Sequence, residues 1–169
     1  GLFVIACYSC NQKKTLFSAL PSEKTGIDFQ NTILENDSVN ILDFENVYNG
    51  GGVGVGDFNN DGLQDLYFTG NLVSNKLYLN KGDFRFQDIT KEASVDGEGK
   101  WNRGVAIVDI NNDGWQDIYV CASINKEPSK RTNLFYINQG KQENGIPVFK
   151  EMAKEYNLAD PGFSVHAAF

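Results

Sequence analysis

The chain has 169 residues, of which 41% are hydrophobic and 12% aromatic, and its formal net charge is −7 at pH 7. This composition is typical of a folded protein and argues against a disordered chain. No run of basic residues is longer than two, so the phosphate contacts that nucleic-acid binding requires are not expected. An acidic chain is expected to bind cations instead.

The first ten residues, GLFVIACYSC, form an apolar stretch too short to span a bilayer. They resemble the end of a bacterial lipoprotein signal peptide, where an aliphatic, a variable and a small residue precede the lipidated cysteine. The residues VIA precede Cys7, so the resemblance implies lipidation of Cys7. Cys10 is a second candidate, and a buried strand with a core cysteine is the alternative. We expect residues 1–10 to be a signal-peptide remnant with a lipobox and residues 11–24 a polar tether.

Residues 25–47 contain one strand-like segment, GIDFQNTI, from Gly26 to Ile33. It is similar to FRFQDIT further along the chain, with Phe29 in the place of Phe86. We predict a lone N-terminal strand here, without a repeat of its own. We expect this strand to complete the last blade by pairing with strands of the longer protein beyond residue 169, and a pairing of Phe29 within the first repeat would refute this.

Two acidic loops repeat with a period of 52 residues, from Asp57 to Asp109. The loops DFNNDGLQD and DINNDGWQD are identical at seven of nine positions, and the segments NKLYLNKG and NLFYINQG behind them also match. A period of this size indicates a propeller, a solenoid or an array. The segment FSVHAAF aligns with WNRGVAI, which precedes the second loop. The predicted units are residues 48–98, residues 99–160 and, as the start of a third repeat in a longer protein, residues 161–169.

Each complete unit contains four short apolar segments separated by Gly, Asn and Asp, which predicts four antiparallel strands. Four such strands are the blade of a β-propeller, which closes with roughly four to eight blades. We therefore predict an all-β fold, a fragment of a β-propeller with about two blades and the lone N-terminal strand. The predicted strands are residues 52–56, 66–69, 76–80 and 84–88, then 104–108, 118–122, 133–138 and 148–151.

The acidic loops place oxygen ligands at alternate positions. The predicted ligands of the first loop are the side chains of Asp57, Asn59, Asp61 and Asp65 and the carbonyl of Leu63. Ca²⁺ takes six to eight oxygen ligands of these kinds, and the glycine at position six allows the sharp turn. The second loop supplies Asp109, Asn111, Asp113, the Trp115 carbonyl and Asp117. We predict one calcium ion in each loop.

Three other interpretations of the loops carry less weight. Asn, Asp and Gly are ordinary turn residues, so a hairpin turn held by Asx hydrogen bonds without metal is possible. An EF-hand requires a glutamate at position twelve, where this chain has Phe68 and Val120. Magnesium demands a tight octahedron and keeps its waters, which makes calcium the better match.

The pattern GVGDFNNDGLQDLYF resembles the FG-GAP repeat of integrin α-chain propellers, and more closely the bacterial VCBS-type repeats of secreted or lipid-anchored proteins. The resemblance extends from Tyr48 to Phe169, with Val108 in the second repeat where the first has Gly56. It implies that calcium loops join the first two strands of a blade and stiffen the propeller. It also implies that partners bind the loops of the other face.

These observations lead to one functional expectation and one alternative. We expect a calcium-binding repeat module of a bacterial protein, secreted or lipid-anchored at the outer membrane or cell surface, that binds a protein or carbohydrate ligand. No nucleic-acid binding is expected, and membrane contact is expected only through the lipid anchor. We expect no catalysis within this chain, since its single histidine, His166, and its cysteines lie in no nucleophile motif. The alternative is an accessory module of an extracellular polysaccharide-degrading enzyme with catalytic residues elsewhere.

Overall fold

The computed structural model describes residues 15–37 and 39–169. The predicted signal-peptide remnant, with Cys7 and Cys10, lies outside the described residues. Within the described residues, no helix is both long and apolar enough to cross a membrane. The helical elements are short: α1 (Ser22–Thr25), α2 (Thr90–Ala93) and the 3-10 helix η1 (Pro128–Arg131).

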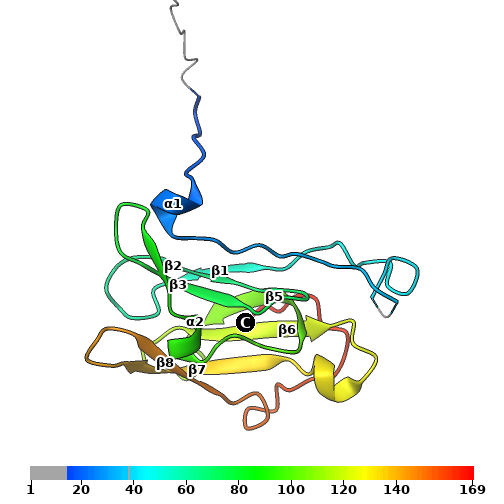
Figure 1. Ribbon diagram of the computed structural model, residues 1–169. Helices are drawn as coiled ribbons and strands as arrows, with labels where there is room; N and C mark the ends of the chain where they lie inside the picture. The colour runs from blue at the N-terminus through cyan, green and yellow to red at the C-terminus, as the bar shows by residue number, and fades with distance from the viewer. Residues whose placement is uncertain (1–14, 38) are drawn as a thin grey trace, which may run out of the picture.

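The eight strands form two separate four-stranded antiparallel sheets (Figure 1). In each sheet the strands are hydrogen-bonded in chain order. This arrangement confirms the predicted all-β fold of four-stranded antiparallel units, and it is consistent with part of a propeller. The first sheet contains β1 (Val53–Gly56), β2 (Asp65–Phe68), β3 (Lys76–Asn80) and β4 (Phe86–Asp88). The second contains β5 (Trp101–Val108), β6 (Asp117–Ser123), β7 (Leu134–Lys141) and β8 (Pro147–Glu151).

A shared apolar core joins the two sheets. Tyr67 and Leu77 of the first sheet and Ile118 and Val120 of the second are fully buried members of the same cluster. The first strand of each sheet lies at the contact, because a Cβ atom on Gly54 would come within 2.7 Å of the Ile107 side chain. Glycines in β1 therefore let β1 and β5 approach each other closely.

The C-terminal segment continues this arrangement on the far side of the second sheet. The amide of Gly104 donates to the carbonyl of Val165 at 3.0 Å. A Cβ atom on Gly104 would meet Val165, just as one on Gly52 would meet Arg103. Residues 163–169 thus lie against β5 in the way that β5 lies against β1. The contacting residues, Val165 and Arg103, are equivalent in the alignment of FSVHAAF with WNRGVAI.

The N-terminal segment differs from the prediction, because residues 26–35 form no strand. The ring of Phe29 instead stacks on Phe68 at a centroid distance of 5.2 Å, and the side-chain amide of Asn31 donates to Asn71 at 2.7 Å. Side chains rather than a backbone ladder hold this segment on the first sheet. Phe29 therefore has no strand partner within the first repeat.

Candidate metal centre

The first acidic loop connects β1 to β2 and is organised by its own carboxylates. Asp57 accepts hydrogen bonds from the amides of Asp61 and Gly62 at 3.1 and 2.8 Å. Asp61 accepts one from the amide of Leu63 at 2.9 Å. Gly62 has a φ of +87°, a left-handed conformation that glycine adopts without steric cost. The loop therefore wraps its backbone around the carboxylates at positions one and five.

The second acidic loop connects β5 to β6 and has the same geometry. Asp109 accepts from the amides of Asp113 and Gly114 at 3.1 and 2.9 Å, and Asp113 accepts from the amide of Trp115 at 2.8 Å. Gly114 has a φ of +86°. The two loops are therefore alike in these hydrogen bonds and differ at position three, where Asn111 is exposed and accepts from the amide of Asp113 at 3.2 Å.

The aspartate at position nine is buried in both loops. Asp65 accepts from the amides of Phe58 and Asn80 at 3.0 and 2.8 Å. Burial raises the pKa of Asp65 to about 6; the two backbone hydrogen bonds lower it, and the charges of Asp61 and Asp57 add to the increase. Each carboxylate oxygen uses one hydrogen bond here and keeps a second acceptor position.

Asp117 repeats the role of Asp65 in the second loop. It accepts from the amides of Ile110 and Asn138 at 3.1 and 2.8 Å. Burial is the main cause that raises the pKa of Asp117, and the charges of Asp113 and Asp109 act in the same direction. In both loops a cation beside the buried carboxylate would favour its ionised form.

Position three of the first loop carries an acceptor without a partner. Asn59 is 5% exposed, and its side-chain oxygen is buried with no hydrogen bond. Its side-chain nitrogen donates to Asp61 at 3.0 Å and to the carbonyl of Gly145 at 3.3 Å. Buried acceptors without partners are rare in folded proteins, and an amide oxygen is a common calcium ligand. The residues at positions one, three and five therefore fit a hard cation.

The carboxylates are not drawn into a closed cluster, however. Within residues 15–37 and 39–169, no three His, Cys, Asp or Glu side chains form a group that could hold a metal ion. An asparagine side chain and a backbone carbonyl, the predicted ligands at positions three and seven, do not count toward such a group. Only the three carboxylates of a loop, at positions one, five and nine, could form it. The structure places the five predicted ligands in one loop, with the carboxylates turned to backbone donors.

Contacts with the second sheet fix the first loop in place. The amide of Asp57 donates to the side chain of Gln116 at 2.7 Å. Asn138 donates to the carbonyl of Phe58 at 2.9 Å, and Asn60 donates to the carbonyl of Gly114 at 3.0 Å. Gln116 and Asn138 were not predicted as supporting residues. The signal for Gln116 was the glutamine at position eight of both loops.

These loops and strands have a counterpart among known protein families. Residues 57–120 match the model of the FG-GAP-like repeat. The FG-GAP-like segment begins at the first predicted ligand of the first loop and ends within β6. The predicted resemblance to the FG-GAP repeat is confirmed over this segment.

Three curated relatives have the same name, cartilage acidic protein 1, and two of them illustrate the similarity. The protein from Xenopus tropicalis is 40% identical over 74 residues, which is 43% of this chain and 11% of that protein. The protein from Homo sapiens is 39% identical over 72 residues, which is 42% of this chain and 11% of that protein. The matched region thus spans about a tenth of the length of these relatives.

Proposed function

We propose that the chain is a calcium-binding β-propeller module of a cell-surface or secreted protein, and that it presents a surface for a protein or carbohydrate partner. Bacterial origin and a lipid anchor at Cys7 belong to the same proposal and rest on the sequence pattern of residues 1–10. The proposal for calcium rests on the two loops, and the proposal for a partner rests on the opposite end of the sheets.

The repeated loop geometry carries the calcium proposal, together with the buried free oxygen of Asn59. In the first loop the ion would be held by Asp57, Asn59, Asp61, the Leu63 carbonyl and Asp65, and bound water would complete a shell of six to eight oxygens. The equivalent set in the second loop is Asp109, Asn111, Asp113, the Trp115 carbonyl and Asp117. An ion would attract the carboxylates of each loop toward one point and neutralise their repulsion.

A cavity at the opposite end of the sheets supports the proposal of a partner surface. Its volume is about 720 Å³, and the β2–β3, β4–β5 and β6–β7 connections contribute to its walls. Trp101 lines it, and the indole nitrogen of Trp101 is buried without a hydrogen-bond partner. Leu72 and Lys126 lie on the same walls. A partner with both apolar and hydroxyl or carbonyl groups would suit this mixture.

Calcium stoichiometry tests the proposal at single residues. Asp113→Ala and Asp61→Ala are each expected to lower the calcium bound by the intact protein by one equivalent, because each removes a ligand and the loop hydrogen bond at position five. Isothermal titration calorimetry with calcium, at concentrations around ~10⁻⁴ to 10⁻³ M, measures this. Asp43→Ala makes the same change of charge at an exposed position and should leave the stoichiometry unchanged. Equal stoichiometry in all four proteins would exclude both sites.

A further inference from the structure

Arg103 is a buried cation with no counter-ion within the described part of the chain. It lies near the start of β5 and is 7% exposed. One terminal nitrogen, Nη2, donates to the carbonyl of Asn46 at 2.9 Å, whereas Nε is buried without any partner. The ion pairs found among residues 15–37 and 39–169 do not include Arg103. Burial lowers the pKa of Arg103, and no neighbouring carboxylate offsets this effect.

A guanidinium group nevertheless stays charged in proteins. A buried charge without a partner is unfavourable, so such a group is normally paired or bound to a ligand. The single bond to Asn46 uses one of the five N–H donors of Arg103. Among the residues that the structure describes, no anion therefore pairs with Arg103.

Arg103 is one of the residues that line a cavity. Its volume is about 420 Å³, within the range of small-molecule sites. Its walls consist of Asn49, Gly50, Gly51, Arg103, Gly104, Val165 and His166. Asn49 and His166 are exposed, so the cavity opens to solvent. β1 and β5 each end at an acidic loop, whereas Arg103 lies at the other end of β5. This cavity is therefore distinct from the candidate calcium sites.

The repeat shows that blade architecture does not require a cation at this position. The period that aligns Gly104 with Gly52 aligns Arg103 with Gly51, and the C-terminal segment has Val165 at the equivalent place. The bond to Asn46 does not explain the charge either, because a neutral amide side chain could donate to the same carbonyl. Arg103 therefore serves something particular to this point of the molecule.

We propose that the cavity lined by Arg103 binds the carboxylate of a small acidic ligand, such as an acidic sugar. A carboxylate matches the planar donors of a guanidinium group and can accept two hydrogen bonds from it. Asn49 and His166, which are exposed and line the same cavity, are further polar groups for the ligand. This inference does not depend on calcium binding, because no residue of the acidic loops lines the cavity.

Calorimetric titration of the intact protein with sodium glucuronate tests this inference, with glucose and sodium chloride at equal ionic strength as matched controls. Glucuronate is expected to bind and glucose is not. Arg103→Gln is expected to weaken glucuronate binding about tenfold or more, because it removes charge-assisted hydrogen bonds. Arg103→Lys, which keeps the charge without the planar fork, should fall between the two.

Arg85→Gln provides the matched variant, since Arg85 is an exposed arginine whose removal changes the net charge equally. It should bind glucuronate like the unmodified protein. The inference is overturned if the unmodified protein binds neither glucuronate nor acetate at tens of millimolar, or if Arg103→Gln binds glucuronate equally well. If the Arg103 variants do not fold, as circular dichroism would show, the comparison of glucuronate with glucose in the unmodified protein decides the question alone.

Discussion

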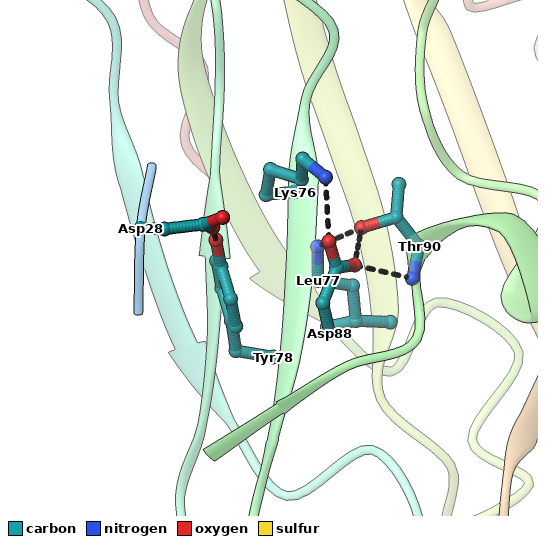
Figure 2. A network of polar contacts seen from close by, with 6 residues as sticks. All are labelled: Asp28, Lys76, Leu77, Tyr78, Asp88 and Thr90. Carbon is teal, nitrogen blue, oxygen red and sulfur yellow. Dashed lines mark hydrogen bonds and ion pairs between the residues drawn. The ribbon is translucent and has the colours of Figure 1, made fainter. Parts of the chain in front are cut away.

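At the scale of single residues, Asp88 connects the end of β4 to β3 and to α2 through its carboxylate (Figure 2). Its carboxylate accepts from the Lys76 ammonium at 2.5 Å and from the hydroxyl and amide of Thr90 at 2.5 and 3.0 Å. The Thr90 hydroxyl in turn accepts from the amide of Leu77 at 2.9 Å, just beyond the last ladder pair of β3 and β4. The Thr90 hydroxyl thus serves as the acceptor for the Leu77 amide where β4 ends, beside the backbone hydrogen bond from the Ile89 amide to the Leu77 carbonyl at 2.9 Å.

Asp88 is expected to make stability depend on pH. Partial burial raises the pKa of Asp88, but the hydrogen bonds from Lys76 and Thr90 outweigh burial, so the pKa lies below its ordinary value. A carboxylate with a lowered pKa stabilises the fold above its unfolded-state pKa, and this contribution disappears as the pH falls through the folded-state value. Asp88→Asn should therefore cost about 1 kcal/mol at pH 7 and little near pH 3.

Urea unfolding of the unmodified protein and of Asp88→Asn at both pH values measures this difference. Glu92→Ala, an exposed acidic residue in α2, is the control and should show no such dependence on pH. An equal cost of Asp88→Asn at pH 7 and pH 3 would contradict the role of the ionised carboxylate.

At the scale of elements, the alternation of Val, Ile, Phe and Tyr between turn residues was sufficient to predict all eight strands. The start of β5 was not predicted, because Asn102 and Arg103 are polar. Asn102 is nevertheless buried, and its side chain donates to Asn75 and to the carbonyl of Gly97, both at 3.0 Å. Asn75 is distant in the sequence, so local patterns cannot reveal this contact. The same limit explains the N-terminal segment, which has a strand-like pattern but docks through side chains.

Asn75 is the buried centre of a polar contact between the sheets. Its side chain donates to the Tyr67 hydroxyl at 2.8 Å and accepts from the amide of Gly70 at 2.9 Å and from Asn102. Asn75→Ala leaves the buried Gly70 amide without its partner and removes one hydrogen bond each from Tyr67 and Asn102, so a loss of about 2–3 kcal/mol in the free energy of unfolding is expected. Chemical denaturation measures it.

Asn49→Ala is the matched control for this substitution. The Asn49 side chain is exposed and donates only to Asn46, at 3.1 Å. A change of about 0.5 kcal/mol or less is expected. Equal losses for Asn75→Ala and Asn49→Ala would show that the buried network does not stabilise the contact between the sheets.

At the scale of the whole molecule, the two sheets pack against each other through equivalent strands of the repeated unit, β1 and β5. The acidic loops were predictable because their predicted ligands follow one another in the sequence. Their support from Gln116 and Asn138 was not, since these residues approach the first loop only when the second sheet packs against the first. The close approach of β1 and β5 also arises only when the two sheets pack together, and it depends on glycine because a Cβ atom in β1 would collide with β5.

Gly52 is expected to tolerate no side chain. A Cβ atom at this position would lie 2.9 Å from the carbonyl oxygen of Arg103 and 3.1 Å from the amide of Val105, both backbone atoms of β5. Gly52→Ala should therefore destabilise the fold by about 1–3 kcal/mol. In Gly162→Ala the nearest group is the exposed, flexible carboxylate of Asp160, so little change is expected. Denaturant midpoints compare the two, and a Gly52→Ala protein as stable as Gly162→Ala would refute the close packing of β1 on β5.

Calcium is expected to stabilise the whole molecule, because the first acidic loop rests on the second sheet and an ion bound only by the folded state stabilises that state by mass action. Thermal unfolding of the intact protein in millimolar calcium, in EGTA and in equal magnesium is the most direct measurement. Calcium at ten times its dissociation constant should add about 1.4 kcal/mol for each site and raise the melting temperature, EGTA should reverse the rise, and magnesium should not reproduce it. Melting curves that superimpose in calcium and in EGTA would contradict the calcium-binding account.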